Sequence, residues 1–353
     1  MQAGAEGARP STGAGRIAPL TSIRLFAALL VVVYHFGLSA WPFDAGALHR
    51  VVQCAASAVA FFFFLSGFIL AHVYHGARWS ETGVWRRYVV ARVARIYPIY
   101  LLALLAQFAL VAGAVHLDRL SVVELLVSLQ VHAAMLQAWL PDRVARLNIP
   151  GWSLSVEFAF YLMFPWIVQR LMALKEKALV PAFAILFVGS QGFYFTMRAV
   201  IWPEWFHVNP TIHHVLMYHP LIYFPVFMLG MLTFRLGRVV DRAWRIPPGG
   251  MALLSVGSAL GLALCSYGAD DVMTYCIHVG MLSPLYGVLI LSLCDARNGV
   301  ARLLSAGWLS ELGEASYSVY ILQMPVHGLM VRLFPSWGGG ASSVSTGRCW
   351  GPS

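Results

Sequence analysis

The sequence predicts an all-α membrane protein, a polytopic bundle of about nine transmembrane helices. Hydrophobic residues make up 59% of the 353 residues, and charged residues only 11%. A water-soluble domain carries about 25% charged residues, so this chain has too few charges to cover a globular surface of its size. The mean hydropathy of +0.71 points the same way.

Long apolar stretches recur along the chain, most of them close to the roughly 20 residues that a helix needs to cross a bilayer. Nine are predicted to span: 23–40, 55–74, 96–115, 152–172, 178–197, 221–234, 251–267, 276–294 and 315–334. A tenth stretch, 121–140, is the most polar of the set because it contains Glu124, Gln130, His132 and Gln137.

The distribution of arginine indicates how this tenth stretch behaves. If 121–140 spanned the bilayer, the arginine-rich segments 78–95 and 235–245 would lie on opposite sides. If it does not, both lie on the side of the N-terminus, as the positive-inside rule expects. We therefore predict an interfacial or re-entrant helix at 121–140. The chain is then an integral protein of a bacterial plasma (inner) membrane with a cytoplasmic N-terminus.

The same arrangement explains the formal net charge of +9. Basic loops on one side of a lipid bilayer account for it, and no nucleic-acid partner is predicted. Three segments follow from the composition: a disordered cytoplasmic lead at 1–21, a membrane domain at 22–334 and an atypical Gly/Ser-rich tail at 335–353.

The first span contains two ionisable residues, Arg24 and His35. At about 100° per residue they share one helix face, about 16 Å apart along the axis. Intramembrane charges are costly and usually face the bundle interior. Arg24 at the cytoplasmic rim suits an anionic group, and His35, deeper in the bundle, suits a general base. The alternative for His35 is a hydrogen-bonded packing residue.

A second pair of cations opens the third span. Arg92 and Arg95 are three residues apart, on one helix face, and Tyr97 follows them. Two guanidiniums at this spacing can bind a phosphate or pyrophosphate. Topological anchoring by a basic loop is the alternative.

A carboxylate lies near the start of the fourth span. Ser153, Glu157 and Tyr161 are spaced four residues apart and share a face, with Trp152 beside them. Because this span is predicted to begin outside, we place Glu157 at the depth of His35, where it could orient and polarise the imidazole. A structural hydrogen-bond network is the alternative.

The second span contains Gly67, which would allow close helix packing. Its neighbour Ser66 is not in a G-x-S-x-G turn and is not proposed as a nucleophile. The histidines at 207–219 lack the spacing of metal ligands, and no metal site is predicted.

These motifs together resemble the acyltransferase-3 family of integral membrane acyltransferases. They are the R-x10-H spacing of Arg24 and His35, the FFFxLSGF run at 61–68, R-x-x-R followed by Ile-Tyr-Pro at 92–98, WSLSVE at 152–157 and SYSVY at 316–320. They occur in the family's order over residues 17–334.

The resemblance implies a membrane enzyme that moves an acyl group, often acetyl from acetyl-CoA, to a hydroxyl of a carbohydrate, glycolipid or small molecule. His35 would then be the catalytic residue, with Glu157 as its partner, and Arg92 and Arg95 would lie on the donor side. The predicted substrate-binding set is Arg24, Arg92, Arg95, Tyr97, Trp152 and Ser153. Acyl-CoA is a donor substrate here, and no permanently bound cofactor is expected.

Two departures from the family pattern stand out. Gln323 occupies a position shortly after the SYSVY segment where the family often has a histidine. The family also usually has a tenth span, whereas this chain changes abruptly to the glycine-rich sequence at 338–340. We expect a missing terminal helix, which the downstream coding DNA would reveal as a hydrophobic stretch in another frame.

A different class of protein could use the same intramembrane charges. A proton-coupled transporter or flippase of a lipid-linked or acyl substrate also needs Arg, His and Glu within its spans. The arginines cluster on one side and no inverted repeat is seen, which favours a phosphorylated donor over a transport path. The cost of burying so many charges disfavours a non-catalytic scaffold.

Overall fold

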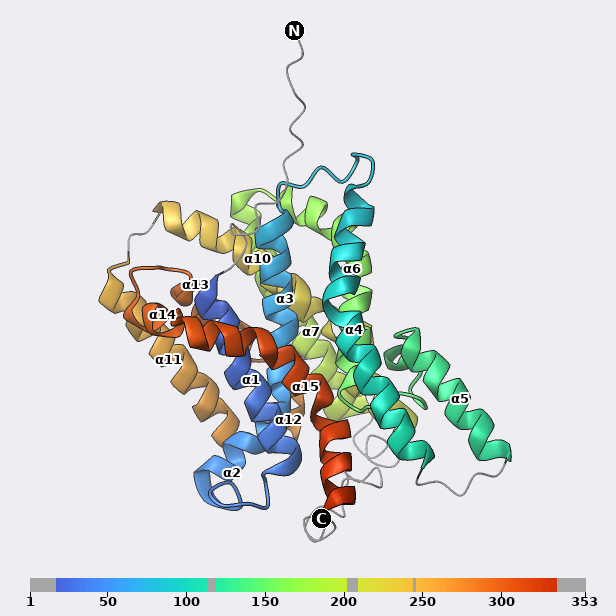
Figure 1. Ribbon diagram of the computed structural model, residues 1–353. Helices are drawn as coiled ribbons and strands as arrows, with labels where there is room; N and C mark the ends of the chain where they lie inside the picture. The colour runs from blue at the N-terminus through green and yellow to red at the C-terminus, as the bar shows by residue number, and fades with distance from the viewer. Residues whose placement is uncertain (1–16, 114–118, 202–208, 244–245, 335–353) are drawn as a thin grey trace.

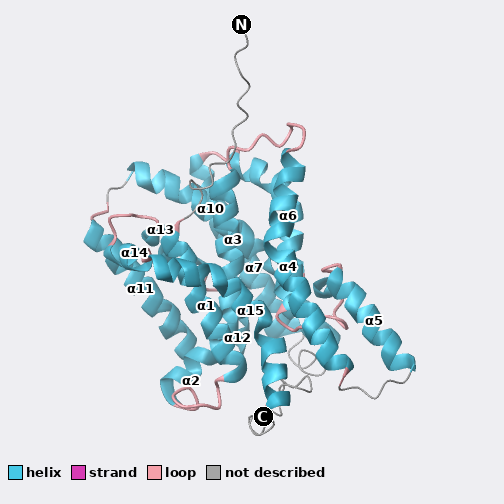
Figure 2. Ribbon diagram, viewed as in Figure 1, coloured by secondary structure: helices cyan, strands magenta, loops and turns pink. Residues whose placement is uncertain are grey.

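The computed structural model describes residues 17–113, 119–201, 209–243 and 246–334, and within these ranges it contains helices and no strands (Figures 1 and 2). The predicted all-α bundle is confirmed. Six helical segments in the described chain are long and apolar enough to cross a membrane. They are α1 (Ala18–Phe36), α4 (Val84–Ala112), α6 (Gly151–Met172), α7 (Glu176–Phe195) with its π-helical extension Thr196–Ile201, α9 (Pro210–Tyr218) continued by α10 (Pro220–Ala243), and α11 (Pro248–Tyr267).

Two further spans are broken. The pair α2 (Gly46–Gln53) and α3 (Ala58–Tyr74) and the pair α12 (Asp271–His278) and α13 (Ser283–Leu293) are each bent by more than 40°, and they bring the described spans to eight. The last helix, α15 (Gly307–Leu333), follows the short α14 (Gly299–Leu304). It is long enough to span but too polar to count with the eight, and the ninth predicted stretch, 315–334, falls on it.

Helix starts differ from the apolar boundaries. α1 begins at Ala18, four residues before the predicted domain start, because Pro19 suits the first turn of a helix. α4 begins at Val84, well before residue 96, and its basic first turns are helical like the rest. Apolarity marks only the part of a helix that meets hydrocarbon. The tail at 335–353 and most of the lead lie outside the described residues.

The tenth stretch forms α5 (Arg119–Ala133), which has 15 residues. At 1.5 Å per residue it is about 22 Å long, too short to cross the hydrocarbon core. After it the chain turns at Met135, which has a positive φ of 55°, and continues into a short 3₁₀ helix at Gln137–Trp139. The structure agrees that this segment does not span, and Figure 1 shows α5 at the side of the bundle.

Glycines set the closest helix contacts. α3 packs extensively against α10, and α1 against α15. A Cβ at Gly67 would overlap the carbonyl oxygen of Phe227, and one at Gly230 would overlap that of Phe64. Gly313 has the same relation to the Thr21 carbonyl of α1. The predicted role of Gly67 in close packing is therefore confirmed.

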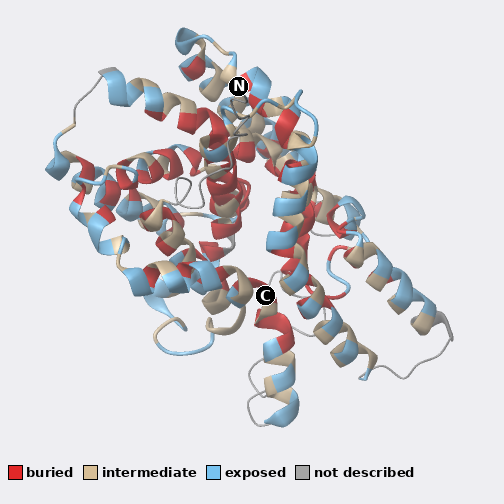
Figure 3. Ribbon diagram, turned by 45° about the horizontal axis from the view of Figure 1, so that its top comes forward, coloured by how far each residue is buried: buried red, intermediate tan, exposed pale blue. Residues whose placement is uncertain are grey.

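The outer faces are apolar, as a surface that meets lipid should be. Buried residues run along the inner faces of the helices, and exposed ones lie outward (Figure 3). Ile185 on α7 is 73% exposed, and Leu253 on α11 is 75% exposed. Such side chains would be unfavourable in water but suit a hydrocarbon solvent.

Replacing Gly67 or Gly230 by alanine should destabilise the bundle by about 1–3 kcal/mol, because the new methyl group meets a backbone carbonyl that cannot move aside. Thermal unfolding in detergent measures this effect. Gly189→Ala on α7 is the matched control, since nothing lies within 4 Å of its Cβ position. Equal melting temperatures for all three variants would contradict the close α3–α10 contact.

Candidate active site

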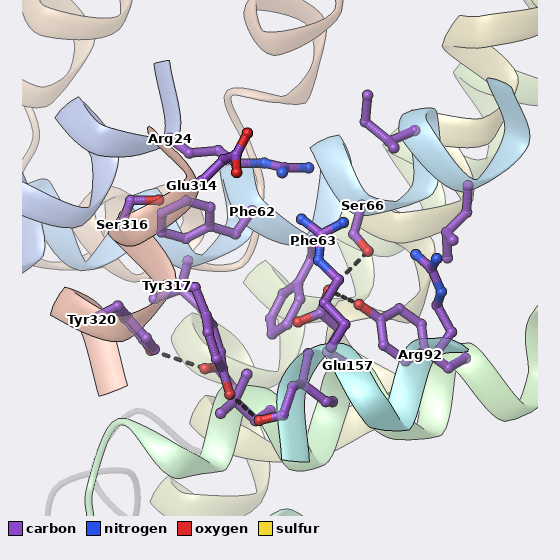
Figure 4. A pocket seen from close by; sticks show the side chains of 18 of the residues that line it. Arg24, Phe62, Phe63, Ser66, Arg92, Glu157, Glu314, Ser316, Tyr317 and Tyr320 are labelled. Atoms are coloured by element: carbon purple, nitrogen blue, oxygen red, sulfur yellow. Dashed lines mark hydrogen bonds between the residues drawn. The ribbon is translucent and has the colours of Figure 1, made fainter. Parts of the chain in front are cut away.

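A cavity of about 110 Å³ lies where α1, α3, α4, α6 and α15 meet (Figure 4). Its wall combines aromatic and aliphatic side chains with charged and hydroxyl groups. The polar residues are Arg24, Ser66, Arg92, Arg95, Ser153, Glu157, Tyr161, Glu314, Ser316, Tyr317 and Tyr320. The three arginines singled out in the sequence therefore line one cavity, although they come from two different helices.

Glu157 is held inside the bundle through one of its two carboxylate oxygens. Its Oε1 accepts a hydrogen bond from Ser66 Oγ at 3.0 Å and another from the Tyr161 hydroxyl at 2.6 Å. Tyr161 is one turn further along α6, as the four-residue spacing predicted, and Ser66 comes from α3. Two donors on one oxygen offset much of the cost of holding a carboxylate away from water.

Arg92 is held by an aromatic neighbour. Its Nη2 donates to the Tyr74 hydroxyl at 3.4 Å, and its guanidinium lies 5.6 Å from the centre of the same ring. Its Nε is buried and has no hydrogen-bond partner in the described part of the chain. Buried donors are normally paired, so this N–H is an unsatisfied donor on a residue that lines the cavity.

A second cavity, of about 270 Å³, adjoins the first. It begins beside Ile17 and Thr21 at the start of α1 and shares Arg24, Arg95 and Glu314 with the inner cavity. The two cavities thus lie next to each other between the N-terminal end of α1 and Glu157. With three guanidiniums against the carboxylates Glu157 and Glu314, the inner cavity has a formal charge of +1. This charge suits an anionic ligand.

Three wall residues had no role in the sequence prediction. The Tyr320 hydroxyl is 2.9 Å from Ser153 Oγ, and the Tyr317 hydroxyl donates to the Ile96 carbonyl at 2.6 Å. Both tyrosines belong to the SYSVY segment, which the sequence analysis identified as a family motif without giving its tyrosines a role in the site. Glu314 lies two residues before that segment, and nothing in its spacing indicated that it would join the arginines.

His35 lies elsewhere. It is half-buried near the C-terminal end of α1, does not line the cavity, and its Nδ1 is 3.0 Å from Oε1 of Gln323 on α15. The expected His35–Glu157 pair is therefore not formed. The sequence prediction puts both residues at one depth because it treats the helices as upright. The packing instead brings Glu157 to the Arg24 end of α1, about 16 Å from His35 along the helix.

Two other predicted substrate-binding residues are outside the cavity lining. The Tyr97 hydroxyl donates to the Ala133 carbonyl at 3.0 Å and so ties α4 to the end of α5. Trp152 is 5% exposed and packs edge-on against Tyr218, with ring centres 5.0 Å apart. Tyr97 and Trp152 thus hold helices together. Ser153, the neighbour of Trp152, does line the cavity.

Comparison with known proteins identifies the family of this chain. Residues 18–348 match the family model of the acyltransferase domain of the acyltransferase-3 family. The chain is 31% identical over 340 residues to acyltransferase MdmB of Streptomyces mycarofaciens, covering 90% of this chain and 79% of MdmB. No solved structure matches it. The chain therefore belongs to the acyltransferase-3 family and is a membrane-embedded O-acyltransferase.

Proposed function

We propose that this acyltransferase takes its acyl group from acyl-CoA, with acetyl-CoA as the first candidate. The acceptor is a hydroxyl of a cell-surface glycan, glycolipid or similar molecule. The enzyme works in the bacterial inner membrane with its N-terminus in the cytoplasm. The observation that carries the donor assignment is the convergence of Arg24, Arg92 and Arg95 on one cavity with an approach from the start of α1.

The donor's phosphates suit these arginines. A guanidinium presents planar, paired N–H donors that match phosphate oxygens, and it keeps its charge when partly buried. Arg95 is exposed and lines both cavities, where it can meet the ligand first. Arg92 adds the buried Nε that has no partner among the described residues. A neutral acyl arm can then extend deeper into the bundle.

The transfer itself is assigned to His35. Its imidazole takes the proton of the acceptor hydroxyl as the oxygen attacks the thioester carbonyl. The new C–O bond forms, the C–S bond breaks, and the proton passes to the departing thiolate. Transient acylation of the imidazole itself is the alternative route. Both require an unprotonated ring nitrogen.

Glu157 serves the donor side in this scheme. Its carboxylate offsets part of the arginine charge, and the bonds from Ser66 and Tyr161 fix its position. It keeps the guanidiniums from repelling one another when no donor is bound. This replaces the role beside His35 that the sequence suggested.

Transfer is tested directly with purified protein. We expect it to release free CoA from acetyl-CoA only when a hydroxyl acceptor is present, and a deletion strain to lose acyl groups from its surface glycans. Release with neither acetyl-CoA nor longer acyl-CoA donors would contradict the donor assignment. Unchanged surface acylation in the deletion strain would contradict the acceptor class.

Replacing both Arg92 and Arg95 by alanine should raise the KM for acyl-CoA at least about tenfold, because each loses charge-assisted hydrogen bonds to phosphate. Steady-state kinetics in detergent or nanodiscs measure it. The control removes the exposed Arg86 and Arg87, which belong to the same helix but not to the cavity. If the arginines only anchor the helix, the two double variants will behave alike.

His35→Ala should abolish transfer, a loss of about 10²–10⁴-fold in kcat, while the protein still inserts and folds. Activity and size-exclusion profiles of the same preparation separate the two effects. His49→Ala on α2 controls for loss of a histidine near the same end of α1. Near-normal turnover by His35→Ala would remove the catalytic assignment and leave the donor site unaffected.

A further inference from the structure

Within the described chain, His35 has a hydrogen bond to the backbone of Val31 on its own helix and one to Gln323, which comes from a distant part of the chain. Gln323 is 6% exposed, and its Oε1 lies 3.0 Å from Nδ1 of His35. The two side chains come from α1 and α15, which pack extensively against each other. At Gly313 the backbone of α15 lies directly against that of α1, towards the start of α1 from this pair. Helix packing therefore holds the two side chains together in addition to their own hydrogen bond.

The orientation of the Gln323 amide follows from its second bond. Its Nε2 donates to the backbone carbonyl of Tyr320 at 2.8 Å. A carbonyl oxygen can only accept, so the NH₂ group must face Tyr320 and the amide oxygen must face the imidazole. That oxygen also only accepts, which means that Nδ1 of His35 carries the hydrogen. In the neutral ring, Nε2 is then the unprotonated nitrogen.

The segment that carries Gln323 is anchored from outside α15. Pro325 has no N–H, so the Ile321 carbonyl one turn earlier loses its usual helical partner. Nδ2 of Asn148, which is fully buried, donates to this carbonyl at 3.0 Å. A side chain from the loop before α6 thus replaces the backbone hydrogen bond that the Ile321 carbonyl lacks. Gln323 thus sits between two fixed points, Ile321 and Pro325.

Gln323 also connects His35 to the cavity. Tyr320, whose carbonyl receives the Gln323 amide, lines the cavity and contacts Ser153 through its hydroxyl. His35 is therefore linked to the wall that holds the charged cluster, although it does not line that wall itself.

We propose that Gln323 is a positioning residue that fixes the tautomer and ring orientation of His35, so that Nε2 presents its lone pair to the acceptor hydroxyl. This inference rests on the proposed catalytic role of His35. An amide suits the task in a membrane because it accepts the Nδ1 hydrogen without adding a charge to the bundle.

The test compares two replacements of similar size. Gln323→Met removes the hydrogen-bond acceptor but suits an apolar interior. Gln323→Glu keeps an acceptor oxygen but introduces an ionisable carboxyl group. If Gln323 positions His35, the Gln323→Met variant should have a kcat about 10²-fold lower with the KM for acyl-CoA unchanged. The Gln323→Glu variant should keep most of the turnover that Gln323→Met loses. A residue that only packs would give the opposite order.

Gln169→Met is the matched control. Gln169 also donates to a backbone carbonyl of its own helix, that of Pro165 at 2.7 Å, and it has no histidine partner among the described residues. Its replacement should leave kcat unchanged. In ¹⁵N-histidine NMR spectra, the resonance lost in His35→Ala should show the Nδ1–H tautomer, and Gln323→Met should shift it toward Nε2–H.

The outcomes separate the two levels of the argument. An active His35→Ala variant would overturn the catalytic role itself, whatever Gln323 does. An inactive His35→Ala together with normal kcat in Gln323→Met would overturn the positioning role alone. Equal loss of kcat in Gln323→Met and Gln323→Glu, with both proteins folded, would also overturn it, because an acceptor would then not matter.

Discussion

The hydrocarbon core of a bilayer offers no hydrogen-bond partners, so every charged side chain inside the bundle has to find them in the protein or in a ligand. This constraint organises the interior of the molecule. Glu157 finds one donor on its own helix and one on α3, and Arg92 finds a tyrosine but keeps one buried N–H without a partner in the described chain. Arg92 is not alone in this, since Arg235 also has a buried Nε without a hydrogen-bond partner in the described chain, but Arg92 lines the cavity.

The same constraint explains why polar groups and tight backbone contacts alternate along the bundle. Where glycines let helices approach, the backbones of α3 and α10 come into direct contact, as at Gly67 and Gly230. Where the helices diverge, the space between them contains arginines, carboxylates and tyrosine hydroxyls. The close contact between α3 and α10 at Gly67 fixes the neighbouring Ser66, which donates a hydrogen bond to Glu157.

The spans were predictable because hydropathy measures the same property that selects them, transfer into hydrocarbon. The breaks between α2 and α3 and between α12 and α13 were not, since a bent span has the composition of a straight one. Helical phase correctly grouped Glu157 with Tyr161 and Ser153. It could not show which helix each face meets, and so it paired Glu157 with His35 and missed Glu314. Gln323 was visible only as a departure from the family pattern, and its contact with His35 required the fold.

The position of the arginines also has an electrical consequence. Moving one elementary charge through a membrane potential costs about 2.3 kcal/mol per 100 mV. With Arg24, Arg92 and Arg95 near the N-terminal end of α1, an acyl-CoA donor bound as proposed would keep its phosphates at that end of the bundle. Only the uncharged arm of the donor would enter the field. In the proposed scheme the neutral acyl group would then reach His35 without moving a charge through the membrane potential, so this movement would need no electrical work.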